Sequence, residues 1–312
     1  MIVVGGEALV DLVPGEPLDS TVDGGLRALL PRLGGGPYNV ALAAARLGAP
    51  SAFLSRVSDD RFGQALLKRL HESGVDTALV QRGAEPTTLA VVALDEKGSA
   101  HYTFYTEGTA DRLVADPGPL EDATMLCLGT LGMVLEPGAS VYETMLRRES
   151  ARGVLTALDP NIRAALIGDA DAYRARFAAW LPYVRLLKLS DDDAEWLAGG
   201  KDAVEAAKEW VAAGVDAVVL TRGADGLAVI TAEGELAEVP AERVAVVDTI
   251  GAGDTVQGAL LTYLHERGIR DLTKMDAEMW RAALAFAAKA ASITVSRSGA
   301  EPPTAEEMVS AV

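Results

Sequence analysis

A glycine-rich turn that ends in a carboxylate is the stretch of this sequence best suited to chemistry. Residues 246–259 read Val-Val-Asp-Thr-Ile-Gly-Ala-Gly-Asp-Thr-Val-Gln-Gly-Ala, and we expect a helix to start near Asp254. The small residues Gly251, Ala252 and Gly253 leave the amide N–H groups of a helix start open to an anion, and the helix dipole adds about half a positive charge there. A carboxylate in such a site repels phosphate, but it can accept the proton of a hydroxyl that attacks the phosphate. The alternative is that Asp254 only caps the helix, which leaves the glycines unexplained.

A second glycine cluster lies near the start of the chain. Residues 34–39 read Gly-Gly-Gly-Pro-Tyr-Asn and open a helical stretch that runs to Leu47. Glycines let backbone approach a ligand closely, and Asn39 offers both a donor and an acceptor. The alternative is a glycine-rich loop with Asn39 as its helix cap. Upstream, Asp11 follows the first apolar run, and in open α/β sheets the carboxyl ends of the strands line the ligand crevice. A solvated loop residue is the other interpretation of Asp11.

Other common sites are disfavoured. The sequence has neither the G-x-x-x-x-G-K-[ST] nor the G-x-G-x-x-G pattern, which argues against P-loop and dinucleotide-binding proteins. Cys127 is the single cysteine and the three histidines are far apart, so we expect neither an intrachain disulfide nor a zinc cluster. The single cysteine also favours the cytoplasm.

Composition narrows the class of protein further. The chain has 312 residues, 49% of them hydrophobic and 23% charged, which is typical of a globular protein with a large core. Its net charge of −17 disfavours nucleic acid as a partner. The first residues lack a basic segment, and no apolar run is long enough to span a bilayer, so we expect neither a signal peptide nor a membrane protein.

The elements that must position these motifs follow an alternating pattern. Short apolar runs, hydrophobic almost throughout, alternate with alanine-rich amphipathic stretches, as in a doubly wound α/β sheet covered on both faces. The expected strands are Ile2–Val4, Ala52–Val57, Met125–Leu128, Val154–Leu158, Val184–Leu189 and Ala217–Leu220, and the expected helices are Tyr38–Leu47, Phe62–Ser73, Asp202–Ala213, Thr255–Arg267 and Met279–Ser292.

Two regions do not fit this alternation. Thr87–Leu94 and Ser99–Thr106 flank the turn-rich sequence Asp-Glu-Lys-Gly and predict a β-hairpin. Leu12–Leu33 contains several prolines and glycines without helical periodicity, which is consistent with further short strands. Because no repeat or linker is visible, we expect one domain over residues 1–312, with a β extension from about 12–33 and 87–106.

Taken together and in this order, the two glycine motifs resemble the signatures of the ribokinase family of sugar kinases, also called the phosphofructokinase-B family. Residues 34–41 match G-G-x-x-x-N-x-A, and residues 248–254 match D-T-x-G-A-G-D. Further similarities follow in the family's order over essentially the whole chain, namely at Asp11, the hairpin, 159–163, 188–193, 221–226 and 293–300.

The resemblance implies a ribokinase-like α/β fold, a doubly wound and mostly parallel sheet with helices on both faces, plus a small β-sheet lid over a sugar. It implies transfer of the γ-phosphoryl group of ATP to a sugar hydroxyl, with Mg²⁺ arriving mainly with ATP. Asp254 would be the catalytic base, and the amides of Gly251, Ala252 and Gly253 would stabilise the transferred group. The substrate residues would be Asp11, Gly34, Gly35, Gly36, Asn39 and Asp254, and the ATP residues Thr221, Gly223, Gly226, Gly251, Gly253 and Ser292.

The chain departs from the family pattern at one place. Many members have N-x-x-E near the metal and the phosphates, where this chain has Ser190 and Asp193. Ser190 and the preceding Lys188 are expected on the ATP side, and Asp193 would reach a metal through water. The alternative for Asp193 is an acidic first helical turn. In relatives a monovalent cation such as K⁺ is held by carbonyls near the positions of Asp248 and Ile250.

The choice of sugar depends on two segments. Asp-Pro-Asn-x-Arg at 159–163 resembles fructokinases and ketodeoxygluconate kinases, and Arg163 is expected to contact substrate or phosphate unless it forms only a surface ion pair. Thr106 stands where ketodeoxygluconate kinases tend to have an arginine for the acid's carboxylate, which favours a neutral sugar. Tyr102, Phe104 and Tyr105 suit a lid face against sugar carbon or, alternatively, packing within the lid. Fructose is the first expectation, followed by 2-keto-3-deoxygluconate, ribose, and a nucleoside or inositol.

A protein of another class remains to be weighed. A non-catalytic sugar-binding regulatory protein on the same fold would keep Gly35 and Asn39 but would have no need of Asp254. A hydride-transfer enzyme is disfavoured by the missing glycine fingerprint. The expected partners are a sugar and ATP, and a homodimer through the lid is a further expectation.

Overall fold

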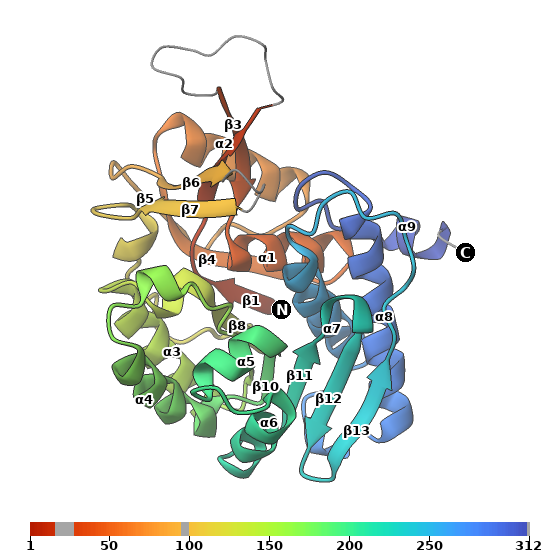
Figure 1. The fold of residues 1–312 in the computed structure, drawn as a ribbon. Coiled ribbons are helices and arrows are strands. Elements are labelled where there is room, and N and C mark those ends of the chain that lie inside the picture. Colours follow the sequence, from red (N-terminus) through yellow and green to blue (C-terminus); the bar gives the residue numbers. More distant parts are fainter. Residues whose placement is uncertain (16–27, 95–99, 311–312) are drawn as a thin grey trace.

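A nine-stranded sheet forms the centre of the computed structural model, which describes residues 1–15, 28–94 and 100–310 (Figure 1). Its order is β13-β12-β11-β10-β9-β8-β1-β4-β5, parallel from β11 to β5, with β12 and β13 antiparallel at one edge. The strands are β1 Ile2–Gly5, β4 Ser51–Ser58, β5 Val80–Gly83, β8 Met125–Gly129, β9 Leu155–Asp159, β10 Leu186–Ser190, β11 Ala217–Thr221, β12 Leu227–Thr231 and β13 Gly234–Val239.

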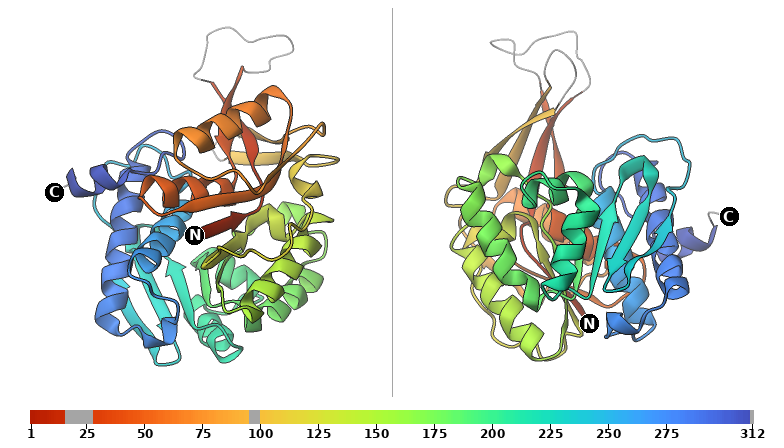
Figure 2. Two further views of the ribbon diagram at one scale, coloured as in Figure 1. Left: turned by 180° about the vertical axis from the view of Figure 1, so that it is seen from behind. Right: turned by 60° about the horizontal axis from the view of Figure 1, so that its bottom comes forward.

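Helices cover both faces of this sheet (Figure 2). Ile2 and Val4 of β1 pack on the side of α1, α2, α7, α8 and α9, whereas Val3 packs on the side of α3 to α6. Strands covered on both faces explain the continuous apolar runs of the sequence. The helices are α1 Gly36–Arg46, α2 Arg61–Glu72, α3 Gly138–Ala151, α4 Ala170–Trp180, α5 Asp191–Leu197, α6 Ala203–Ala212, α7 Ala252–Glu266, α8 Ala277–Val295 and α9 Ala305–Ser310.

A smaller four-stranded sheet of order β3-β2-β6-β7 rises above the carboxyl end of β1, at the top of Figure 1. Its strands are β2 Leu9–Pro14, β3 Leu29–Gly34, β6 Thr88–Leu94 and β7 Ala100–Tyr105. The predicted ribokinase-like fold, with its β extension, is therefore confirmed. The first strand of this smaller sheet, β2, starts at Leu9, before the predicted segment that begins at Leu12, because β2 follows β1 almost directly. Residues 16–27 of the predicted segment, and the expected hairpin turn, lie outside the described residues.

The two helices that carry the glycine motifs begin differently from most others. Carboxylates of Asp60, Asp169, Asp202 and Asp276 cap α2, α4, α6 and α8 by accepting backbone N–H groups. By contrast, α1 and α7 start on glycine caps with no side-chain hydrogen bond. Helix α7 begins at Ala252, two residues before the predicted start. The start of α7 is thus left open to a ligand, whereas the Gly36 N–H at the start of α1 donates to the Glu7 carboxylate.

Helices α1 and α7 also touch along a seam of small residues. A Cβ at Gly258 of α7 would lie 2.6 Å from Ala43 Cβ and 3.0 Å from the Val40 carbonyl oxygen of α1. One turn further on, Thr262 Oγ1 donates to the Ala44 carbonyl at 3.5 Å. The helices run side by side in the same direction, so their two glycine starts lie next to each other. Within the described residues, no helix has the length and hydropathy to cross a membrane.

Candidate active site

A cavity of about 510 Å³ lies between the smaller sheet and the carboxyl ends of β1, β8, β9 and β10. This is the edge at which parallel α/β sheets bind ligands. Its lining is rich in polar groups: Glu7, Leu9, Asp11, Val13, Gly35, Gly36, Asn39, Val92, Tyr102, Phe104, Thr130, Leu131, Asn161, Arg163, Lys188, Thr249, Ile250, Gly251, Gly253 and Asp254. We call it the polar cavity.

The two glycine motifs meet in this cavity through one hydrogen bond. Asn39 Nδ2 donates to Asp254 Oδ2 at 2.8 Å, and both side chains are buried. Burial raises the pKa of Asp254 to about 6, and the hydrogen bond from Asn39 opposes that rise. Within the described residues, Asp254 Oδ1 accepts no hydrogen bond, so it is available to a ligand. Asp254 and Asn39 are inside the first turns of α7 and α1, which makes neither of them a helix cap.

The turn before Asp254 has the backbone geometry of an anion site. Gly251 adopts the left-handed conformation with φ of 77°, and a Cβ there would lie 2.5 Å from Ala300 Cβ. The Ala252 N–H is turned toward the Thr249 carbonyl at 3.3 Å, whereas the N–H groups of Gly251, Gly253 and Asp254 have no acceptor among the described residues. The open amides are therefore those of Gly251, Gly253 and Asp254, and the expectation for Ala252 is corrected.

A buried ion pair lies directly beside this turn. Lys188 Nζ donates to Asp159 Oδ2 at 2.6 Å and to the Gly253 carbonyl at 3.2 Å. Burial opposes the charge of Lys188, but the Asp159 carboxylate outweighs it and raises the pKa of the ammonium group. Lys188 lines the polar cavity and has a third N–H that these contacts leave uncommitted.

Glu7 was not predicted as a site residue, although it follows the first strand directly. Its two carboxylate oxygens accept the N–H groups of Gly36 at 3.0 Å and Gly132 at 3.1 Å. Glu7 is 2% exposed, and this burial raises its pKa to about 8. At Gly35, which has φ of 114°, a Cβ would lie 2.6 Å from the Glu7 carbonyl oxygen. The glycine cluster is therefore needed for close backbone packing as well as for access.

Asp11 and Arg163 approach the cavity from opposite sides. Burial raises the pKa of Asp11 to about 6, and Arg163 opposes the rise. A Cβ at Gly34 would lie 2.5 Å from Asp11 Oδ2, so Gly34 makes room for this carboxylate and is not itself part of the cavity lining. Arg163 donates to Asn161 Oδ1 at 2.8 Å, and Asn161 itself has a positive φ of 40°.

The aromatic residues of β7 divide between two faces. Tyr102 and Phe104 stack with centroids 6.0 Å apart and line the cavity. Tyr105 alternates to the other face and is 58% exposed, so the structure places it outside the cavity. Thr106 is buried, and its carbonyl accepts from Thr109 and Arg112. Thr106 does not line the cavity, so its hydroxyl does not reach it, and the preference for a neutral sugar stays a prediction based on the absent arginine.

A second cavity, of about 620 Å³, lies on the other side of the Gly253 turn. It shares Thr249 and Gly253 with the polar cavity and is otherwise lined mainly by small and apolar residues, with Glu242 and Arg243 as its charged members. We call it the apolar cavity. Its lining residues are Thr221, Gly223, Ala224, Gly226, Leu227, Ala241, Glu242, Arg243, Val244, Val246, Thr249, Ala252, Gly253, Val256, Ala288, Ala291, Ser292 and Val295. The lining residues between 241 and 246, and those of α8 before Ser292, were not predicted from the sequence as individual site residues.

Three of the residues expected near ATP or metal lie elsewhere. Lys188 lines the polar cavity and not the apolar one. Ser190 lines neither cavity, because its hydroxyl caps α5 by accepting the Asp193 N–H at 3.1 Å. Asp193 Oδ1 in turn accepts the Ile162 N–H at 3.1 Å. Asp193 thus holds the loop that carries Arg163, and the described residues contain no cluster of acidic, His or Cys side chains suited to a metal.

The residues expected near a monovalent cation have a suitable arrangement. Asp248 Oδ1 accepts the Ile250 N–H at 3.0 Å, and Oδ2 accepts the Gly299 N–H at 2.8 Å. The backbone carbonyls of Asp248 and Ile250 accept no hydrogen bond among the described residues. Two free carbonyl oxygens fit a hard cation such as K⁺.

A buried carboxylate beside an open anion turn, with a polar cavity on one side and an apolar one on the other, is an arrangement suited to phosphoryl transfer to a hydroxyl. The model of the pfkB family of carbohydrate kinases matches residues 1–307. The chain belongs to this family, which confirms the resemblance to the ribokinase family.

Several similar proteins are fructokinases by name, and aminoimidazole riboside kinase from Salmonella enterica is a further structural neighbour, with a TM-score of 0.82 at 26% identity, covering 99% and 98% of the two chains. Fructokinase from Rhizobium leguminosarum bv. trifolii is 39% identical over 269 residues, which cover 85% of this chain and 79% of that protein. The structure of Xylella fastidiosa fructokinase with bound ATP has a TM-score of 0.88 at 30% identity, covering 99% and 97% of the two chains. A Vibrio cholerae fructokinase double mutant with fructose, ADP and potassium ion has a TM-score of 0.85 at 25% identity, covering 99% and 97%.

Proposed function

We propose that this protein is an ATP-dependent fructokinase. The observation that carries the proposal is the position of Asp254, which lies in the polar cavity at the turn that separates it from the apolar cavity. The sugar occupies the polar cavity and the nucleotide the apolar one, so that the attacking hydroxyl and the γ-phosphoryl group meet at the Gly253 turn.

On the sugar side, Asp254 Oδ1 accepts the proton of the attacking hydroxyl, whose oxygen then bonds to the γ-phosphorus as ADP leaves. A base with a pKa of about 6 is ionised at neutral pH and is still basic enough to take the proton. Asn39 orients the base through its 2.8 Å hydrogen bond. Asp11, the backbone at Gly35 and Gly36, and Arg163 hold the other sugar hydroxyls, while Tyr102 and Phe104 cover the sugar carbon.

On the phosphate side, the open amides of Gly251, Gly253 and Asp254 stabilise the charge that develops on the transferred group. Lys188 directs its remaining N–H toward the same group, and the buried Asp159 keeps its ammonium group charged and in place. The predicted contact of Lys188 with ATP would therefore be with its γ-phosphoryl group. Thr221, Gly223, Gly226 and Ser292 border the nucleotide.

The cations enter in two ways. Mg²⁺ accompanies ATP and neutralises its phosphates, and it holds few protein ligands because the described residues contain no acidic cluster. The carbonyls of Asp248 and Ile250 would hold K⁺, whose charge would support the anion turn next to them.

Support for fructose comes mainly from the relatives, since Thr106 itself does not line the polar cavity. The direct test is a panel of fructose, 2-keto-3-deoxygluconate, ribose, a nucleoside and inositol with ATP and Mg²⁺, measured by ADP release. We expect fructose to have the highest kcat/KM. Preference for another sugar would refute fructokinase activity, and no turnover with any of them would refute the kinase assignment to this site.

The smaller sheet, β2, β3, β6 and β7, is proposed to act as the lid over the sugar. Closure would exclude water that competes with the sugar hydroxyl. Fructose should therefore slow hydrogen exchange in 88–94 and 100–105, and ATP alone should not. A homodimer through this sheet stays a prediction that light scattering can test. Tyr105, which is exposed on the face away from the cavity, would become buried in the dimer interface.

A further inference from the structure

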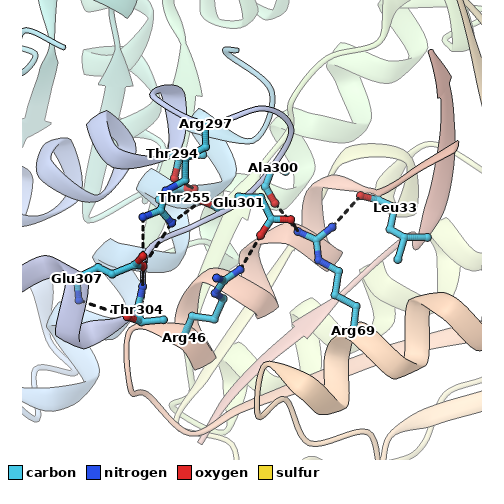
Figure 3. Close-up of polar contacts among 10 residues, drawn as sticks. All are labelled: Leu33, Arg46, Arg69, Thr255, Thr294, Arg297, Ala300, Glu301, Thr304 and Glu307. Atoms are coloured by element: carbon cyan, nitrogen blue, oxygen red, sulfur yellow. Dashed lines mark hydrogen bonds and ion pairs between the residues drawn. The ribbon is translucent and has the colours of Figure 1, made fainter. Parts of the chain in front are cut away.

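An arginine on α2 reaches a loop that supports the anion turn from outside both cavities (Figure 3). Arg69 donates through one terminal nitrogen to the Ala300 carbonyl at 2.6 Å and to Glu301 Oε1 at 2.8 Å. Its other terminal nitrogen donates to the Leu33 carbonyl at 3.4 Å. Arg69 therefore joins β3 of the smaller sheet to the loop formed by residues 299–301.

This loop touches the anion turn at two points. Ala300 packs so closely on Gly251 that a Cβ on the glycine would lie 2.5 Å from Ala300 Cβ. The neighbouring Gly299 N–H donates to Asp248 Oδ2, while Oδ1 of the same carboxylate holds the Ile250 N–H. Any shift of the loop is thus transmitted to residues 248–251, whose backbone sets the direction of the open amides.

Helix α2 is itself tied to the smaller sheet at its other end. Asp60 accepts both the backbone N–H of Thr87 at 2.9 Å and its hydroxyl at 2.8 Å, just before β6 begins. The helix therefore contacts the smaller sheet at both of its ends, and only its last turn reaches the loop 299–301. Neither end lines a cavity.

We propose that Arg69 is a positioning residue for phosphoryl transfer, which holds the Ala300 carbonyl and through it the anion turn. The proposal rests on the proposed function only in assigning that turn to the transferred phosphoryl group. Because Arg69 also donates to the Leu33 carbonyl, one guanidinium group contacts both the smaller sheet, on the sugar side, and the loop 299–301, on the phosphate side. Stabilisation of the transition state depends on donors that are already in position, so a small displacement of the turn affects kcat more than KM.

Arg46 of α1 provides a matched control. It contacts the same Glu301, through Oε2 at 2.9 Å, and its side chain is about as exposed as that of Arg69, 22% against 19%. Within the described residues it makes no bond to the carbonyl of Ala300 or of Leu33. Comparing variants of Arg69 and Arg46 therefore separates the loss of the hydrogen bonds to backbone carbonyls from the loss of an ion pair with Glu301.

The experiment uses Arg69→Met, Arg69→Lys, Arg46→Met and Glu301→Gln of the full chain. We expect Arg69→Met to lower kcat about ten- to a hundredfold, the order of loss caused by a displacement near 1 Å, with KM for both substrates within about threefold. Arg69→Lys should resemble it, because one ammonium group cannot reach two separate carbonyls. Arg46→Met and Glu301→Gln should stay within about threefold of the parent in kcat, since both keep the Arg69 bond to Ala300.

Hydrogen exchange without ligands gives a readout independent of turnover. Exchange in peptides covering Ile250 and 299–301 should speed up in both Arg69 variants and not in Arg46→Met. Equal effects of Arg69→Met and Arg46→Met, or a loss in Glu301→Gln as large as in Arg69→Met, would overturn the proposal, as would unchanged exchange in the Arg69 variants. If the parent phosphorylates no sugar, the proposed function fails, and the exchange result still decides whether Arg69 holds the loop.

Discussion

The two cavities that meet at Gly253 differ in the chemistry of their linings. The polar cavity is lined by side chains that hydrogen-bond and are themselves fixed by other side chains, such as Asn39 on Asp254. The apolar cavity is lined mainly by small and aliphatic residues and by backbone. A sugar exposes hydroxyls that each need a partner, because an unpaired buried polar group costs about 1–3 kcal/mol. A flat base needs mainly apolar surface of the right width.

This difference implies that single substitutions should act differently on the two sides. On the polar side, removing one atom breaks a defined bond. On the apolar side, removing an atom changes little, and only an added side chain that occupies the space should matter. The following experiments test that contrast.

The largest effect is expected where both cavities meet. Asp254→Asn should lower kcat by about 10²–10⁴, because it removes the general base with a nearly isosteric change. ATP affinity, measured by calorimetry, should stay close to that of the parent. The exposed Asp192→Asn serves as a control for charge. Turnover of Asp254→Asn within about threefold of the parent would refute the role of base.

The pH dependence should reveal the same carboxylate. Asp254 must be ionised to act, and burial raises its pKa to about 6, so activity is present above that pH and is lost as the pH falls. Below pH 6, kcat/KM should drop about tenfold per unit for one group. Asp11, whose pKa is also about 6, would make the drop steeper. Asp11→Asn should then restore the shallower slope, measured from pH 4.5 to 8 at about one reading per half unit.

Loss of a polar-side contact comes next. Asn39→Ala should weaken fructose binding about ten- to a hundredfold and ATP binding much less. It should also move the acid limb of the pH profile upward, because the hydrogen bond from Asn39 opposes the rise in the pKa of Asp254. Unchanged sugar affinity in calorimetric titration would mean that Asn39 serves only to link α1 and α7.

Binding in the apolar cavity should be sensitive to added side-chain volume. Ala291→Phe adds a large side chain to the wall of the apolar cavity and should raise KM for ATP about tenfold, as expected for overpacking. KM for fructose should stay near that of the parent. Ser292→Ala, on the same wall, removes only one hydroxyl and should change KM for ATP much less. A larger loss in Ser292→Ala than in Ala291→Phe would contradict the contrast between the cavities.

The smallest effect is expected at Asp193, outside both cavities. Asp193→Asn retains an oxygen for the Ile162 N–H, so kcat should stay within about threefold. A direct metal ligand would behave otherwise, and a strong loss that high Mg²⁺ restores would show that Asp193 reaches the metal.

The sequence predicted the polar cavity better than the apolar one, and the contrast explains why. Asp11, Asn39 and Asp254 belong to residue types whose chemistry is visible in a motif, and all three line the polar cavity. The apolar cavity is lined by alanines and valines, such as Ala288 and Val246, which in a sequence look the same as core residues. Only their place in the fold makes them part of a site.

Errors on the polar side have a related origin. Tyr105 has a suitable type, but one-residue alternation along β7 decides its face, and periodicity alone did not show which aromatic residues face inward. Ser190 and Asp193 stand where many family members have N-x-x-E, yet their hydrogen bonds are used inside the fold. Glu7 was missed because a carboxylate that holds two backbone amides has no sequence signature beyond its place after β1.

The seam between α1 and α7 has a consequence for how such an enzyme can diversify. The spacing between the two glycine turns depends on close helix contact at Gly258 and Ala43. The strands of the smaller sheet contribute nothing to that contact. Insertions or exchanges in β2, β3, β6 and β7 can therefore alter which alcohol is accepted while this spacing stays constant. Substrate specificity and catalysis would then depend on different parts of the chain, so a new specificity could arise without changes to the residues at the reaction centre.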